Sequence, residues 1–122
     1  MNMISLSEQK DKTHCTHCHI HTTKRIYNIP LEDILFIESC QKKSMIHTAA
    51  EIICLPLPLY RIREILPAAF FLQTHRSFLV NMNNISHIDK QTDPWTVFFF
   101  HSEKQAYISR RFRQTVTDAV TD

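Results

Sequence analysis

The chain has 122 residues, and its 43% hydrophobic and 10% aromatic content suffices for one packed domain but not for two. A formal net charge of +2 makes the molecule only slightly basic, so any surface that binds nucleic acid must be confined to part of it. Because the sequence contains no glycine, it has no phosphate-binding loop, dinucleotide-binding fingerprint or nucleophile elbow, and enzymes built on these motifs are excluded.

The N-terminal sequence bears on where the protein resides. Residues 1–13 are polar, show no periodicity and lack the apolar centre of a signal peptide, so we expect a flexible lead there. No stretch reaches the roughly 18 to 20 apolar residues that a membrane-spanning helix needs. We therefore expect a cytoplasmic protein that makes no membrane contact and keeps its four cysteines reduced.

Short extended segments are expected through the first half of the chain. Residues 17–21 alternate so that Cys18 and Ile20 would face a core while three histidines face outward. Further extended segments fall at 26–29, 35–39, 45–48 and 52–55. Between them, the sequence suits a helical turn at 30–34, a polar basic turn at 40–44 and a hairpin turn at 49–51.

One clear helix follows these segments. Leu59, Ile62 and Ile65 have helical spacing, and Pro67 ends the helix. The rest of the chain comprises apolar segments at 70–81, 85–88 and 95–100, a hairpin turn at 102–104, a strand at 105–108 and a closing helix at 110–120. Many short strands with one or two short helices, and no regular alternation of the two, indicate a mainly β domain.

Three segments carry a resemblance to a known family. They are IPLEDILFIES (29–39), FFLQTHRSFLVNMNNISHI (70–88) and YISRRF (107–112). In this order they resemble the LytTR DNA-binding domain, the output domain of many bacterial two-component response regulators. The resemblance implies an elongated, mainly β fold of about ten short strands with one or two short helices. It assigns residues 14–122 to the DNA-binding domain and 1–13 to the lead.

The resemblance also implies three loops that enter successive major grooves of DNA. On this sequence the contact residues fall at Lys42, Lys43 and Ser44, at His75, Arg76 and Ser77, and at Ser109, Arg110 and Arg111. Arginine can place two parallel donors on O6 and N7 of guanine, whereas lysine and serine mostly contact phosphate oxygens. We therefore expect Arg76 and Arg111 to read bases and Lys43 to anchor the backbone.

Simpler structural roles stay open for these residues. Arg76 could be an ion-pair partner of Glu38 or Asp33, and the lysine pair could be no more than a hairpin turn. Arg110, Arg111 and Arg113 could form the solvated face of the last helix. Asn81 fits a turn former better than a base reader. Phe70, Phe71, Phe78 and Phe98 to Phe100 are expected in the core rather than stacked on bases.

A cluster of cysteine and histidine near the N-terminus, HCTHCHIH (14–21), offers a rival function. Thiolate and imidazole suit zinc, and a ligand set of Cys15, His17, Cys18 and His19 is one possibility. An extended strand would spread such side chains by about 6 to 7 Å per pair of residues, which opposes a site on one ion. A thiol pair that senses redox state and an exposed histidine-rich strand remain the alternatives. Covalent haem at CTHCH (15–19) would require export, and no signal peptide is present.

The sequence therefore predicts a transcriptional regulator that recognises specific DNA. We expect it to bind promoter direct repeats in double-stranded DNA, with a second copy bound beside it. No cofactor, small-molecule substrate or enzymatic activity is expected, because no nucleophile, base and orienting acid stand at a meaningful spacing. The receiver domain that normally precedes this module is missing from the sequence, so the chain is either a free-standing regulator or a fragment.

Overall fold

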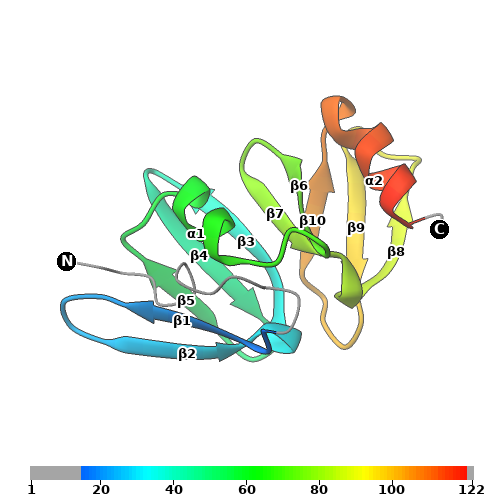
Figure 1. The fold of residues 1–122 in the computed structure, drawn as a ribbon. Helices are drawn as coiled ribbons and strands as arrows, with labels where there is room; N and C mark the ends of the chain where they lie inside the picture. The colour runs from blue at the N-terminus through cyan, green and yellow to red at the C-terminus, as the bar shows by residue number, and fades with distance from the viewer. Residues whose placement is uncertain (1–14, 121–122) are drawn as a thin grey trace.

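The computed structural model describes residues 15–120, and over this range the chain forms three antiparallel sheets (Figure 1). The first pairs β1 (His17–His21) with β2 (Ile26–Pro30). The second has the strand order β5 (Ile52–Leu55), β4 (Lys43–Thr48), β3 (Ile34–Cys40), β7 (Phe78–Asn81) and β6 (Phe71–His75). The third has the order β10 (Gln105–Ile108), β9 (Trp95–Phe99) and β8 (Ile85–Asp89).

The helical segments are short and connect these strands. They are the helices α1 (Leu59–Ile65) and α2 (Arg113–Val120) and the 3-10 turns η3 (Leu31–Asp33), η4 (Met82–Asn84) and η5 (Arg110–Phe112). The mainly β architecture expected from the sequence is confirmed. Between residues 15 and 120, no helix is long and apolar enough to cross a membrane. The expected lead at 1–13 lies outside the described residues.

The first hydrophobic core lies on one face of the five-stranded sheet. Cys18 and Ile20 of β1 are fully buried there, and the intervening histidines are half-buried, so the alternation expected for this strand is confirmed. Helix α1 covers the same core with its regularly spaced Leu59, Ile62 and Ile65. The β1–β2 hairpin and α1 therefore cover the same sheet face, and the central strands supply the residues beneath them.

A second core joins the five-stranded sheet to the three-stranded sheet. Phe36 and Phe78 of the larger sheet pack with Val97 and Phe99 of β9 and with Val116 of α2. Strand β3 serves both cores because both of its faces are buried: Ile34 and Ile37 belong to the first core, and Leu35 and Phe36 belong to the second. Burial on both faces explains why β3 begins as a continuous apolar run rather than an alternating one.

The structure corrects three local expectations. The turn expected at 40–44 is only Gln41 and Lys42, which adopt positive φ angles of 49° and 68° and join β3 directly to β4. Two-residue hairpin turns need such positive φ angles and usually place glycine there, whereas this turn uses glutamine and lysine. The apolar segment 70–81 divides into the hairpin β6–β7. Phe100 lies past the end of β9 and is 54% exposed, so it is not a core residue.

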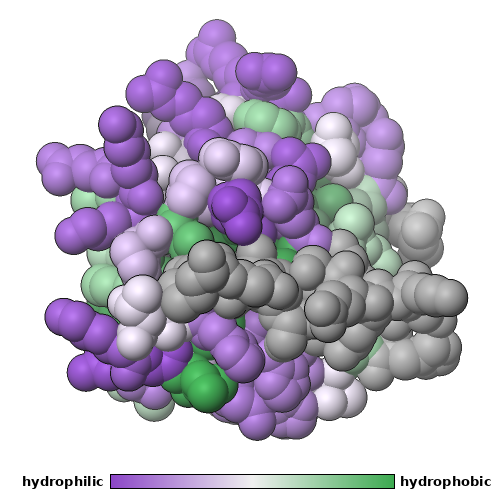
Figure 2. Space-filling view, turned by 60° about the vertical axis from the view of Figure 1, so that its left-hand side comes forward, coloured by the Kyte–Doolittle hydropathy of each residue, from purple (hydrophilic) through white to green (hydrophobic). Residues whose placement is uncertain are grey.

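The surface of the molecule is mainly hydrophilic, as expected when the apolar side chains are buried in two cores. Figure 2 shows one face of the molecule, on which hydrophilic residues predominate and hydrophobic residues appear in small separate patches. Only a few large hydrophobic side chains of residues 15–120 are strongly exposed, namely Ile26, Ile52, Tyr60, Phe100 and Val120. Most of the large apolar side chains are therefore buried in the two cores, and the accessible loops are mainly polar.

Candidate DNA-binding edge

The three loops expected to contact DNA lie along one edge of the molecule. The backbone nitrogen of Ser39 donates to the carbonyl oxygen of Ser77 at 2.8 Å, which joins the end of β3 to the β6–β7 turn. The backbone nitrogen of Ser109 donates to the carbonyl oxygen of Thr74 at 2.9 Å, which joins the third loop to β6. We call this row, formed by residues 41–43, 75–77 and 109–111, the loop edge.

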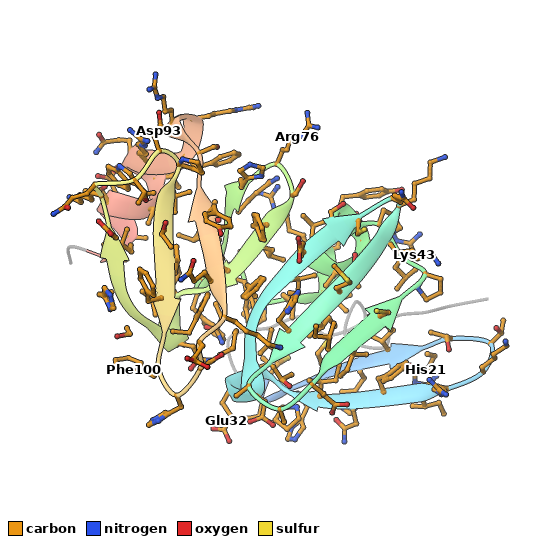
Figure 3. All side chains as sticks on the ribbon, turned by 180° about the vertical axis from the view of Figure 1, so that it is seen from behind. His21, Glu32, Lys43, Arg76, Asp93 and Phe100 are labelled. Atoms are coloured by element: carbon orange, nitrogen blue, oxygen red, sulfur yellow. The ribbon has the colours of Figure 1, made fainter. Side chains whose placement is uncertain are left out.

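Figure 3 shows the loop edge from behind. Asp93 and Arg76 lie at the top of this view and Lys43 lies at its right-hand side above His21, whereas Glu32 and Phe100 lie at the bottom. The side chain of Thr74 strengthens the connection, because its Oγ1 donates to the carbonyl oxygen of Tyr107 at 2.8 Å. Hydrogen bonds between strands thus hold the three loops in a fixed spacing.

The β3–β4 turn presents two lysines but not the serine beside them. Lys42 and Lys43 are exposed. Ser44 is fully buried, and its Oγ donates to the carbonyl oxygen of Leu57 at 2.6 Å. Ser44 belongs to β4, where the side chain faces the first core, so its hydroxyl connects the sheet to the segment before α1 instead of reaching solvent.

The β6–β7 turn presents His75, Arg76 and Ser77. The backbone nitrogen of Ser77 donates to Nδ1 of His75 at 3.1 Å, so this ring nitrogen acts as an acceptor and leaves Nε2 as the donor of the neutral ring. Arg76 is exposed. The alternative in which Arg76 pairs with a carboxylate is wrong within residues 15–120, because Glu38 instead contacts Nε2 of His47 at 3.1 Å and no ion pair includes Arg76.

The third loop contains two exposed arginines with different surroundings. Arg110 Nη2 lies 2.7 Å from Oδ2 of Asp93, whereas the guanidinium of Arg111 lies 5.5 Å from the ring centroid of Phe112. Both arginines belong to η5, ahead of α2, so they do not lie on a face of the last helix. Arg113, the first residue of α2, lies 4.7 Å from the Trp95 ring centroid and is only 27% exposed.

The β8–β9 loop adds residues that the sequence did not single out. Lys90, in the same loop as Asp93, has its Nζ 5.2 Å from the Trp95 ring centroid. Asp93 accepts hydrogen bonds from Arg110 and Arg113, and the hydrogen bond from Arg110 is the main cause that holds its carboxyl pKa below the ordinary value. No spacing in the sequence relates Asp93 to Arg110, because a loop and two strands separate them.

The structure divides the proposed metal ligand set between two faces of β1. Cys18 is fully buried, and burial raises the pKa of its thiol to about 12. His17 and His19 lie on the opposite, half-buried face, with ring centroids 6.2 Å apart. Over the described part of the chain, no group of three or more histidine, cysteine or acidic side chains is arranged to hold a metal ion.

Comparison with known proteins identifies the class to which this fold and edge belong. The sequence model of the LytTr DNA-binding domain matches residues 24–121. The chain therefore belongs to the LytTR family of DNA-binding domains. Among solved structures, the fold matches a LytTr DNA-binding domain of a Bacillus cereus response regulator with a TM-score of 0.73 and 19% identity, covering 88% of this chain and 99% of that one.

Two curated relatives are longer proteins. The transcriptional regulatory protein YpdB of Escherichia coli K12 is 33% identical over 72 residues, which are 59% of this chain and 28% of YpdB. The transcriptional regulatory protein NatR of Bacillus subtilis is 35% identical over 81 residues, which are 66% of this chain and 35% of NatR. The chain thus corresponds to a minor part of each relative.

Proposed function

We propose that this chain regulates transcription by binding a specific DNA sequence through its loop edge. The observation that carries the proposal is that backbone hydrogen bonds join three separate loops, and that these loops expose Lys42, Lys43, Arg76, Arg110 and Arg111. Cations at a fixed spacing suit the phosphates that line a groove, and arginines among them suit base edges. The names of the curated relatives, which are transcriptional regulatory proteins, support the regulatory role.

The distribution of charge explains how a slightly basic protein would bind a polyanion. The acidic residues Glu32, Asp33 and Glu51 are exposed, and Figure 3 shows Glu32 on the side opposite Arg76. The five exposed cations of the loop edge, offset within residues 15–120 only by Asp93 beside them, therefore give this edge more positive charge than the net charge of +2 indicates. DNA would be steered toward the loop edge.

The loop residues divide into two roles. Arg76 and Arg111 are exposed without a carboxylate partner in residues 15–120, so their planar donor groups are free to face guanine. Lys42 and Lys43 carry compact charges suited to phosphate, and Nε2 of His75 and the hydroxyls of Ser77 and Ser109 can add neutral hydrogen bonds there. Ser44 is omitted from this interface because it is fully buried.

We further propose that two copies bind promoter direct repeats side by side. A single loop edge from a domain of this size covers only part of a typical specific interface with DNA, and a second copy in the same orientation would double the contacts. In this proposal residues 14–122 form the DNA-binding unit, and binding requires no cofactor, substrate or catalytic step.

Selection from a pool of random duplexes tests the proposal. Repeated rounds of binding should enrich one sequence motif that occurs twice with a fixed separation, and footprinting should protect both copies. A chain carrying Arg76→Ala and Arg111→Ala is the matched variant and should enrich no motif while remaining folded. Failure of the wild-type chain to enrich any motif at low salt would contradict sequence-specific binding.

A further inference from the structure

Asp93 contacts Arg110, an arginine of the loop edge. Its two carboxylate oxygens are divided between two arginines: Oδ2 lies 2.7 Å from Nη2 of Arg110, and Oδ1 lies 3.0 Å from Nη2 of Arg113. Arg113 is itself held over the Trp95 ring at 4.7 Å and is largely covered. Asp93 is therefore fixed from one side by a packed arginine and, from the other side, orients an arginine that is 78% exposed.

The contact leaves Arg110 able to bind a second partner. A guanidinium has five N–H donors in one plane, and Asp93 takes only one of the Nη2 protons of Arg110. The remaining donors can reach two acceptors on one base edge, as O6 and N7 of guanine require. Arg111 has the ring of Phe112 as its neighbour and, within residues 15–120, no such restraint from a carboxylate. The two arginines of η5 thus differ in how strongly their orientation is defined.

The charge of Asp93 also affects which part of DNA Arg110 can contact. A carboxylate beside the guanidinium offsets its charge and repels a phosphate, but it does not repel the neutral acceptors of a base. An exposed ion pair of this kind contributes little to folding stability, so stability does not account for the arrangement. An effect on binding would account for it instead: weaker non-specific attraction and a defined direction for the remaining donors.

We propose that Asp93 is a specificity-determining positioning residue, which holds Arg110 for base recognition and prevents it from serving as a phosphate anchor. The proposal rests on the proposed function, because it assumes that the loop edge binds DNA. It adds the β8–β9 loop to the recognition surface and assigns Arg110, along with Arg76 and Arg111, to bases. It also assigns an acidic residue a role in binding a polyanion.

The test compares Asp93→Asn with the matched control Asp89→Asn. Both variants remove one negative charge from the same region, but Oδ1 of Asp89 accepts from the backbone nitrogen of Gln91 and not from an arginine. Affinity is measured for the full chain at one salt concentration, on the selected duplex and on a scrambled duplex of equal composition. Asp93→Asn should lower the ratio of the two affinities by roughly tenfold, because the directed contact to one base is lost.

Further binding measurements separate the positioning of Arg110 by Asp93 from a general effect of the lost negative charge. Scrambled DNA should bind Asp93→Asn at least as tightly as wild type, with a salt slope steeper by about one, because Arg110 becomes available to a phosphate. Asp89→Asn should strengthen binding to both duplexes equally and leave the ratio unchanged. In a chain that already carries Arg110→Ala, adding Asp93→Asn should leave the ratio unaltered, because Asp93 acts through Arg110.

The outcomes distinguish this proposal from the proposed function. If wild type discriminates between the duplexes but Asp93→Asn discriminates equally well, the role of Asp93 is overturned and the function stands. If Asp93→Asn lowers the ratio just as much in the Arg110→Ala chain, Asp93 does not act through Arg110 and the proposal also fails. If wild type does not discriminate, both are overturned. Arg110→Lys, which keeps the charge but lacks the planar fork, should lose discrimination as Asp93→Asn does.

Discussion

Nδ2 of Asn81 donates to the carbonyl oxygen of Ile34 at 2.9 Å, which connects two sequence motifs that lie far apart in the chain. The same nitrogen donates to the carbonyl oxygen of Leu31 at 3.2 Å, and Oδ1 accepts from the backbone nitrogen of Asn83 at 3.0 Å. Asn81 is only 1% exposed. It therefore holds η3 and η4 together, in agreement with the expectation that it forms a turn and does not read bases.

Replacing Asn81 should destabilise the fold more than it disturbs DNA contacts. Asn81→Ala leaves the buried carbonyl of Leu31 and the backbone nitrogen of Asn83 without these partners, at a cost of about 1–3 kcal/mol in the free energy of unfolding. Urea denaturation measures this loss. The control is Asn83→Ala, an exposed neighbour, for which we expect a change within about 0.5 kcal/mol. Equal stability of the two variants would show that the hydrogen bonds of Asn81 do not contribute to the free energy of unfolding.

Binding should depend strongly on salt. If the two bound copies together neutralise about five to seven phosphates, the logarithm of affinity should fall against the logarithm of salt concentration with a slope of roughly −4 to −6. Fluorescence anisotropy on the selected duplex, repeated over a series of potassium chloride concentrations, gives the slope. An affinity independent of salt would contradict binding through a cationic edge.

Base readers and phosphate anchors should respond differently to alanine. Arg76→Ala or Arg111→Ala should cost about 1–3 kcal/mol on the selected duplex and less on scrambled DNA. Lys43→Ala should weaken both complexes alike and lower the magnitude of the salt slope by about one. Binding titrations on both duplexes at one salt concentration provide the comparison.

The control for the lysine is Lys24→Ala, because Lys24 is also exposed but lies in the β1–β2 turn, outside the loop edge. It should leave both affinities nearly unchanged. Each variant needs an unchanged thermal midpoint, so that lost affinity does not reflect unfolding. If the two arginine variants lose affinity for both duplexes equally, these arginines anchor the backbone and do not read bases.

Cys18 should differ in reactivity from Cys40 and Cys54. Cys18 is fully buried with a thiol pKa raised to about 12, so it has neither access nor thiolate at neutral pH. Cys40 and Cys54 are exposed and should react with iodoacetamide in the native protein, whereas Cys18 should react only after unfolding. Mass spectrometry of peptides after timed labelling measures each site.

The cysteines also allow a test of the metal alternative. Cys15→Ser, at a half-buried position, should leave DNA affinity within a few-fold under reducing conditions. Zinc bound at one equivalent per chain in the wild type, and lost in this variant, would favour the metal function over an exposed histidine-rich strand. Cys18→Ser is unsuitable for this purpose, because a buried hydroxyl would destabilise the core whether or not metal binds.

Folding stability should decline in mild acid because of His47. Its ring stacks on Phe36 with centroids 4.2 Å apart, and burial lowers its pKa although Glu38 opposes this shift. Since the folded pKa lies below the unfolded one, the unfolded chain binds more protons, and stability decreases as pH falls below about 6.5. Thermal melts between about pH 7 and pH 5 should show this decline, and His47→Gln should reduce it.

His87→Gln is the control for that prediction, because His87 is exposed and stacks on the half-buried Phe98 outside the two cores. This variant should keep the wild-type pH dependence. The exposed Asp93 pair adds little to this decline, because a lowered carboxyl pKa affects stability only at a pH below the range of these melts. A His47→Gln chain with an unchanged pH profile would contradict the role of His47.

Local patterns in the sequence predicted the elements that depend on nearest neighbours. Alternation placed Cys18 and Ile20 inward, helical spacing identified the face of α1 that packs on the sheet, and the motifs indicated the family. These features are determined locally because side-chain direction repeats every two residues in a strand and every 3.6 in a helix. The fold class and the position of the loops along the chain were therefore available from the sequence.

Only the tertiary structure decided which side chains of those loops face solvent and which partners they meet. Ser44 follows two exposed lysines in sequence, but the tight turn at Gln41 and Lys42 directs it into the core. Asp93 and Arg110 meet because β9 and β10 bring their loops to the same edge. Such contacts depend on strand register and on packing between sheets, and these follow from the burial of the whole chain rather than from any local run of residues.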